Sequence, residues 1–268
     1  MFYQRRLLFA FTVPMQGETG YSVRLFRFRI PWIVKITPRT TSTEAHALQF
    51  LHSTDLKIPI PRLVGSFAHA GITYTVMTRV PGTSLLEAAK AGLLSPKMQR
   101  DILHEVCDVL KALDTLRQPD ESEISGKVML STSGHELPDP RYFFEERSGP
   151  FPSVLALWMH VALYDDVDEF ERDVDVGIRN IMESDPIRFV HPDLRMYNVI
   201  IKDGHLSGIV DWEDSGWFPS SWQVHTMRWI RYGCDRFWCS YWIDEHRFSD
   251  EAEAAYAASK TFLIKSPV

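Results

Sequence analysis

The chain has 268 residues, of which 45% are hydrophobic and 24% charged, a balance that excludes the disordered and fibrous classes of protein. Its net charge of −6 offers no general attraction to nucleic acid or to an anionic membrane, so we expect neither partner. The three cysteines are an odd number without zinc-ligand spacing, which favours a reducing, cytoplasmic location over a disulfide framework.

The N-terminal segment imitates a short signal peptide, because Arg5 and Arg6 precede the apolar run Leu7–Pro14. No small-x-small cleavage site follows this run, and no stretch of 18 apolar residues occurs in the chain. Export and a membrane-spanning helix are therefore disfavoured. We expect the segment to form an opening strand.

Short strands dominate the predictions for the first part of the chain. Apolar and basic residues nearly alternate over Tyr21–Phe28, the period of a half-buried strand. The prolines of Ile58–Pro61 require an extended backbone. The predicted strands span residues 21–28, 32–36, 63–67 and 72–78, and a helix begins near Glu44.

The chain becomes mainly helical after the breaker Pro81-Gly82. Ser95 and Pro96 form an N-cap and first turn, and apolar residues then recur every three or four positions up to Leu116, which predicts a long amphipathic helix. A long loop is expected over residues 119–152, and further helix over about residues 154–182. The pattern predicts an α+β fold with a β-rich part at residues 1–80 and a helical part at residues 81–268.

The residues with clearest chemical potential follow Phe189, in the order His191-x-Asp193-Leu194, Asn198 and Asp211. Mg²⁺ prefers oxygen ligands, and the carboxylate of Asp211 and the amide oxygen of Asn198 supply two of them. Phosphoryl transfer also needs a carboxylate that orients the acceptor hydroxyl and takes its proton. Asp193 has this place in an H-x-D-x-x-x-x-N catalytic loop.

A predicted hairpin explains the spacing between the two metal-ligand candidates. Apolar runs at Val199–Lys202 and Ser207–Val210 flank the turn dipeptide Asp203-Gly204. Such a hairpin brings Asn198 beside Asp211. An ordinary hairpin with polar decoration is the plain alternative, but the ordered combination of H-x-D-L-x-x-x-N, hairpin and D-W-E rarely arises by chance.

These motifs resemble the aminoglycoside phosphotransferase and choline kinase superfamily, and in particular its fungal-type members. The resemblance covers about residues 33–229. It rests on His191–Val199, Ile209–Pro219, Val34-Lys35, Glu44, IPIPRL, VMTRVPG and Gly149-Pro150-Phe151. It implies a protein-kinase-like fold with a small β-rich N-lobe and a larger helical C-lobe, ATP as cosubstrate, Mg²⁺, and a small-molecule substrate with a hydroxyl group.

The resemblance also implies roles for residues of the first part. Lys35 contacts the nucleotide phosphates and pairs with Glu44, which agrees with the need of a buried strand lysine for a counter-charge. By itself, a lysine such as Lys35 is more often an edge or snorkelling lysine, but its position ahead of the catalytic passage reverses this balance. Met77 and Arg79 belong to the hinge, where family members hold adenine through backbone groups. Glu213 is expected to add negative charge near the metal or the acceptor.

Two features of the sequence bear on the alternatives to this interpretation. Only Gly17 and Gly20 are available for a phosphate-covering loop, without the G-x-G-x-x-G pattern. Asp211 is followed by Trp-Glu rather than by D-F-G and an activation segment, which disfavours a protein kinase. A catalytically silent nucleotide-binding module is the remaining alternative. Four tryptophans near the C-terminus are expected in the core rather than in a cage for a cationic substrate: Trp222, Trp229, Trp238 and Trp242.

Overall fold

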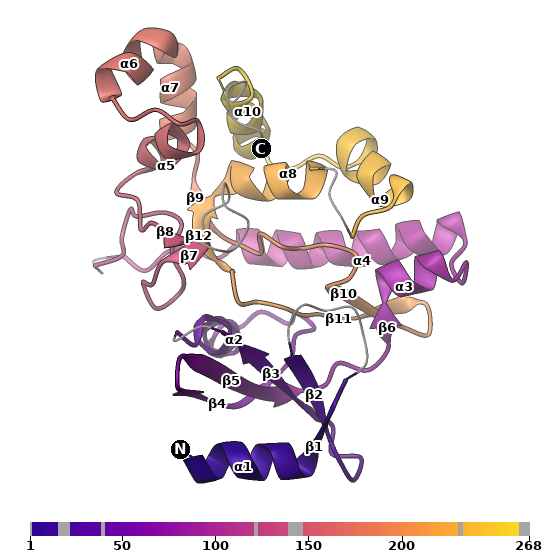
Figure 1. The fold of residues 1–268 in the computed structure, drawn as a ribbon. Coiled ribbons are helices and arrows are strands. Elements are labelled where there is room, and N and C mark those ends of the chain that lie inside the picture. Colours follow the sequence, from indigo (N-terminus) through magenta and orange to yellow (C-terminus); the bar gives the residue numbers. More distant parts are fainter. Residues whose placement is uncertain are drawn as a thin grey trace.

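The computed structural model describes residues 2–15, 22–38, 41–120, 123–138, 147–229 and 233–262. Its N-terminal part is an antiparallel sheet of five strands in the order β1-β2-β3-β5-β4 (Figure 1). The strands are β1 (Thr12–Pro14), β2 (Ser22–Phe26), β3 (Trp32–Thr37), β4 (Leu63–His69) and β5 (Ile72–Thr78). The four strands predicted between residues 21 and 78 are therefore confirmed.

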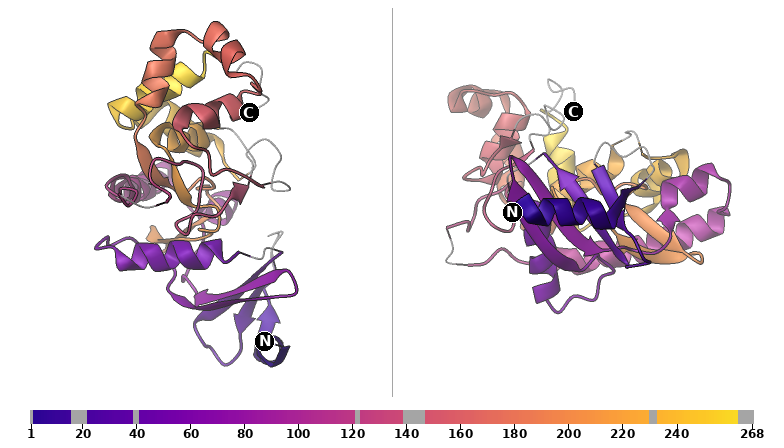
Figure 2. Two further views of the ribbon diagram at one scale, coloured as in Figure 1. Left: turned by 90° about the vertical axis from the view of Figure 1, so that its left-hand side faces the viewer. Right: turned by 60° about the horizontal axis from the view of Figure 1, so that its bottom comes forward.

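The expectation of an opening strand over Leu7–Pro14 is wrong for most of its length. Residues Phe2–Phe11 form helix α1, which lies along the outer side of the sheet, and only β1 is extended (Figures 1 and 2). The helix contains Gln, two Arg, two Leu and Ala, all good helix formers, and no β-branched residue. The first β-branched residues are Thr12 and Val13, where the strand begins.

Helix α2 (Thr43–Ser53) joins the sheet to the rest of the molecule. Its Ala47, Leu48 and Leu51 are buried in the same apolar cluster as residues of the C-terminal part. The ring of Phe50 lies 5.5 Å from that of Phe189 and 5.6 Å from that of Trp217. The two parts thus share one core at this helix, which places Glu44 in its first turn next to the C-terminal part.

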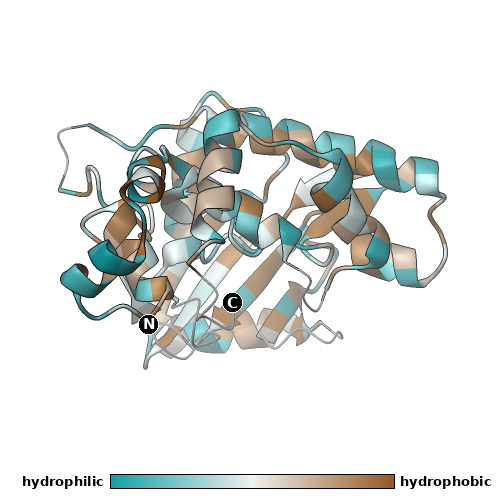
Figure 3. Cartoon of the chain, turned by 90° about the horizontal axis from the view of Figure 1, so that it is seen from above, coloured by the Kyte–Doolittle hydropathy of each residue, from teal (hydrophilic) through white to brown (hydrophobic). Residues whose placement is uncertain are grey.

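The chain leaves the sheet through β6 (Thr83–Ser84), which pairs with a strand of the C-terminal part. Helix α3 (Leu85–Lys90) begins with a capping box between Ser84 and Glu87. The long predicted helix is α4 (Pro96–Asp114), and the Ser95 hydroxyl caps it as expected. Polar and apolar residues are mixed around the helices of this part (Figure 3).

The helical stretch predicted over residues 154–182 is divided into α5 (Val154–Val161), α6 (Val167–Asp173) and α7 (Val176–Glu183). The breaks have a local cause: the carboxylates of Asp166 and Asp175 each accept a hydrogen bond from a backbone N–H and start a new helix. The loop before them contains the short strands β7 (Leu137–Pro138) and β8 (Arg147–Ser148). The remaining helices are α8 (Ser220–Arg228), α9 (Arg236–Ser240), the π-helix η1 (Tyr241–Glu245) and α10 (Asp250–Ser259).

Trp222, Trp238 and Trp242 are buried in the core, as predicted, whereas Trp229 is half-buried. Within the described ranges, no helix combines the length and the apolar character that crossing a bilayer requires.

Two antiparallel ribbons position the loops of the candidate site. Strand β9 (Ile187–Val190) pairs with β12 (Gly216–Pro219), and β10 (Val199–Lys202) pairs with β11 (His205–Ile209). The turn of the second ribbon has positive φ at Asp203 and Gly204, as a two-residue hairpin turn requires. The predicted hairpin is confirmed, and its open end holds the segments that contain Asn198 and Asp211.

Candidate functional site

The loop after β9 is fixed to the segment after β11 by His191. The Nε2 atom of this buried ring lies 3.1 Å from the carbonyl oxygen of Val210, and the ring packs against Trp212 at 4.6 Å. Burial lowers the pKa of His191 to about 4, so the ring is neutral at neutral pH and Nε2 is the nitrogen that donates. A second bond, from Val210 N–H to the Asn198 carbonyl, measures 3.0 Å. The residue before Asp211 is therefore tied to both ends of the loop 191–198.

Asp193 lies in this loop with its carboxylate held by two neighbours. The Tyr197 hydroxyl is 2.7 Å from one carboxylate oxygen and 2.8 Å from the other. The Asn198 side-chain amide donates to Asp193 Oδ2 at 3.0 Å and to the Asp193 carbonyl at 2.8 Å. These bonds fix the orientation of the carboxylate and of the Asn198 amide together.

Burial and the nearby charge of Asp211 raise the pKa of Asp193 to about 6, although the Tyr197 hydroxyl opposes the shift. The group is still ionised at neutral pH. A carboxylate with a pKa close to the working pH is well suited to accept a proton from an alcohol. Burial, and to a smaller extent the charge of Asp193, raises the pKa of Tyr197, so this phenol keeps its proton.

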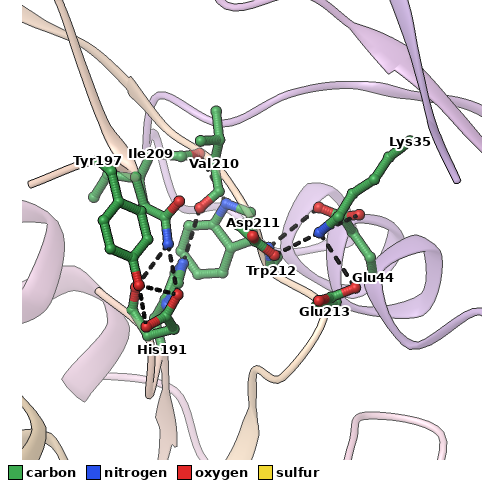
Figure 4. Close-up of polar contacts among 11 residues, drawn as sticks. Lys35, Glu44, His191, Tyr197, Ile209, Val210, Asp211, Trp212 and Glu213 are labelled. Atoms are coloured by element: carbon green, nitrogen blue, oxygen red, sulfur yellow. Dashed lines mark hydrogen bonds and ion pairs between the residues drawn. The ribbon is translucent and has the colours of Figure 1, made fainter. Parts of the chain in front are cut away.

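Lys35 of β3 lies among three carboxylates (Figure 4). Its Nζ atom is 2.5 Å from Asp211 Oδ1, 3.2 Å from Glu213 Oε2 and 3.4 Å from Glu44 Oε2. The predicted pairing with Glu44 is thus present, but the contact with Asp211 is shorter. Glu213 was expected to add negative charge near the metal or the acceptor, and in the structure its carboxylate faces Lys35.

Most of this ion cluster is inaccessible to water. The side chains of Lys35, Glu44 and Glu213 are 7%, 6% and 5% exposed, whereas that of Asp211 is 23% exposed. Burial disfavours the ammonium, but Asp211, Glu44 and Glu213 outweigh it and hold the pKa of Lys35 well above its ordinary value. Burial, together with Asp211, raises the pKa of Glu44 against the opposing effect of Lys35.

Backbone geometry turns Asp211 toward Lys35. Asp211 has φ +66°, a left-handed conformation that aspartate tolerates better than most residues. The next backbone N–H, that of Trp212, donates to Glu44 Oε1 at 3.2 Å. The carboxylate of Glu44 thereby connects helix α2 both to Lys35 and to the Asp211 segment, so the two parts of the molecule meet at this site.

The donor atoms suit a hard cation. Asn198 donates through its nitrogen, and no group in the described ranges donates to its Oδ1, which leaves that oxygen free to accept or to ligate. Asp211 is the most exposed carboxylate around Lys35. The described residues contain no group of three or more His, Cys, Asp or Glu arranged to hold a metal. Mg²⁺ bound here would need phosphate and water oxygens for its other ligands, as it commonly does.

The hinge candidates lie at the end of β5. Met77 is buried and pairs with Ile33 and Leu63, and the Arg79 side chain is exposed. The backbone N–H of Arg79 donates to the Pro31 carbonyl at 2.8 Å. An adenine contact with that N–H would therefore have to replace an existing bond. Gly17 and Gly20, the candidates for a phosphate-covering loop, fall outside the described residues.

Sequence reasoning missed two contacts of this site. The nearness of Glu213 to Asp211 in the sequence was a usable signal for its contact with Lys35, because two residues that close can reach the same site. The bond from Tyr197 to Asp193 joins residues four apart in an irregular loop, where no periodic pattern predicts which side chains meet.

Solved structures with a similar fold are aminoglycoside phosphotransferases. A thermostable mutant of APH(4)-Ia in ternary complex with ADP and hygromycin B has a TM-score of 0.60 at 13% identity, covering 98% of this chain and 88% of that one. The gentamicin–APH(2")-IIa complex has a TM-score of 0.54 at 14% identity, covering 93% and 80%. APH(3'')-Id from Streptomyces rimosus has a TM-score of 0.52 at 15% identity, covering 97% and 96%. The fold is the two-lobed, kinase-like fold of these phosphotransferases.

The family follows from the sequence. The profile of the phosphotransferase enzyme family matches residues 16–224, and the chain belongs to this family. A search of curated proteins gives no significant match. The predicted resemblance is thus confirmed at the level of family and fold.

Proposed function

We propose that this protein is an ATP- and Mg²⁺-dependent phosphotransferase that phosphorylates a hydroxyl group of a small molecule. The observation that supports it most directly is that Asp193 and Asp211 lie on adjoining segments. His191 and Asn198 tie these two segments together. Lys35 contacts Asp211. One structure of similar fold contains ADP and hygromycin B, and another contains ATP and streptomycin. Residues 1–80 would cover the nucleotide, and residues 81–268 would supply the catalytic loop.

In this proposal Asp193 receives the hydroxyl of the acceptor. The acceptor oxygen forms a bond to the γ-phosphorus as the bond to the bridging oxygen breaks, ADP leaves with that electron pair, and the hydroxyl proton passes to Asp193. His191 and Asn198 hold the loop so that the carboxylate keeps its orientation.

Asn198 and Asp211 would hold Mg²⁺, which neutralises charge on the phosphates. Lys35 would exchange one of its carboxylate contacts for the α and β phosphates, while Glu44 keeps it in position. Met77 and Arg79 would border the adenine.

Two substitutions separate these roles. Asp193→Asn should abolish phosphate transfer and leave ATP affinity unchanged, because the carboxylate acts on the acceptor side. Asp211→Ala should instead weaken Mg²⁺-dependent ATP binding. Asp203→Asn is the matched control for the first change, since this exposed turn residue lies at the far end of the hairpin. Equal loss of ATP binding in Asp193→Asn would contradict its assigned role.

A screen of metabolite extracts with γ-labelled ATP tests the activity itself and identifies the acceptor. Labelled product that disappears in Asp193→Asn supports the proposal. Mg²⁺-dependent ATP binding without transfer to any hydroxyl compound would instead favour the silent nucleotide-binding module. The cytoplasmic location remains a prediction.

A further inference from the structure

We propose that Tyr197 occupies the carboxylate of Asp193 until an acceptor hydroxyl displaces it, and that this contact suppresses the transfer of phosphate to water. The inference rests on the proposed phosphotransferase function and assigns a positioning and gating role to a residue of the same loop.

The position of the phenol supports this role. The Tyr197 oxygen is nearly equidistant from the two carboxylate oxygens, at 2.7 and 2.8 Å, so it lies in front of the group, across both inner lone pairs. Asn198 occupies a further site on Oδ2, at 3.0 Å. A hydroxyl approaching the carboxylate from the front therefore meets the phenol first.

The contacts of Tyr197 place its ring on Gly233 and give its hydroxyl a single partner residue among the described residues. Its ring packs directly on the backbone of Gly233, where an added Cβ would lie 2.2 Å from Cε1 and 2.3 Å from Cδ1. Gly233 has φ +89°, which glycine adopts without strain. The hydroxyl bonds only the Asp193 side chain among the described residues, so rotation of the ring breaks no backbone hydrogen bond of the loop.

Water is the competitor that such a contact excludes. Hydrolysis needs the same base: a water oxygen bonds to the γ-phosphorus, its proton passes to Asp193, and ADP leaves with the electrons of the broken bond. While the phenol occupies the front of the carboxylate, a water molecule cannot take the position from which it would pass its proton to Asp193. An acceptor that is held by additional contacts can displace the phenol, whereas a single water gains too little to do so.

The test measures ADP formation from saturating ATP and Mg²⁺ without any acceptor, so it does not require the natural substrate. Tyr197→Phe keeps the ring on Gly233 and removes the hydroxyl. We expect the rate to rise about tenfold or more, because a hydrogen bond to a charged group is worth at least the free energy of a tenfold change in rate. The double variant Asp193→Asn/Tyr197→Phe should lose this gain, because the freed group is the Asp193 carboxylate.

Tyr241→Phe is the matched control, because it removes a tyrosine hydroxyl that contacts buried Cys107 at 3.3 Å in another region. This control should leave the rate of ADP formation unchanged. A rate in Tyr197→Phe at or below that of the wild type, with intact ATP binding, overturns the gate and leaves the proposed function standing. Absence of ADP formation in Tyr197→Phe as well as in the wild type also overturns the gate, whereas the proposed function is decided separately by the transfer screen with γ-labelled ATP.

Discussion

Replacing Lys35 by methionine should destabilise the protein strongly, because it leaves buried carboxylates without their cation. The Lys35 ammonium contacts Asp211, Glu213 and Glu44 at 2.5, 3.2 and 3.4 Å. Glu213 and Glu44 are 5% and 6% exposed, so water cannot replace the lost partner. Removing one member of a buried ion pair typically costs about 3–5 kcal/mol. We expect a loss of that size in the free energy of unfolding at pH 7.5.

The loss should shrink in acid. Without Lys35 the folded-state pKa of Glu44, already raised by burial, rises further above its unfolded value. The penalty for the charged form is present above that folded pKa and disappears as the pH falls through it and the carboxylate takes up a proton. Urea unfolding followed by tryptophan fluorescence, at pH 7.5 and at pH 5, measures both effects.

Lys97→Met is the matched control. Lys97 contacts Asp101 at the same 2.5 Å, but its side chain is 83% exposed. Such a surface pair is screened by water and contributes little to stability. Lys35→Arg keeps the charge, so its loss in the free energy of unfolding should lie between those of Lys35→Met and Lys97→Met. If Lys35→Met costs no more than Lys97→Met, or its cost is the same at both pH values, the reasoning about the buried cluster is refuted.

Other consequences of the structure can be measured separately. Gly216→Ala should lower the free energy of unfolding in urea by about 2 kcal/mol or more, because its Cβ would lie 2.1 Å from the Leu130 carbonyl oxygen. Gly65→Ala is the control, since its Cβ would meet nothing within 4 Å. Equal losses in the two variants would contradict this packing. Burial lowers the pKa of His225 to about 3, so below pH 6.5 the unfolded state binds a proton that the folded state does not. As the pH falls below 6.5, the free energy of unfolding of the wild type should therefore drop by roughly 1.4 kcal/mol per pH unit relative to that of His225→Gln. If the two proteins lose stability in parallel over this range, the ring is not buried in its neutral form. The pKa of Asp193 near 6 predicts that kcat/KM falls as the pH drops through about 6, and a fall centred near pH 4 would exclude this base.

Local patterns predicted much of this fold. The strands from residue 22 to 78, helix α4 with its Ser95 cap, and the hairpin around Asp203-Gly204 follow from periodicity, capping and turn chemistry. The N-terminal helix and the division of residues 154–182 were not predicted, because short apolar runs suit either a helix or a strand. In the second case, single aspartates decide where one helix ends and another begins.

The site shows the same limit. The motif order pointed to the loop of Asp193 and Asn198 and to Asp211, and the hairpin explained why these two segments adjoin. The cluster around Lys35 depends on side chains from three separate segments, and its shortest contact, with Asp211, joins residues 176 positions apart. Such contacts are products of the packing of α2 against the C-terminal part and have no local signature.

A crystal structure with Mg²⁺ and a non-hydrolysable ATP analogue tests the central claim most directly. We predict the metal at Asn198 Oδ1 and Asp211, the α and β phosphates at Lys35, and the terminal phosphate facing Asp193. A nucleotide bound elsewhere, or a metal that contacts neither Asn198 nor Asp211, would contradict the account.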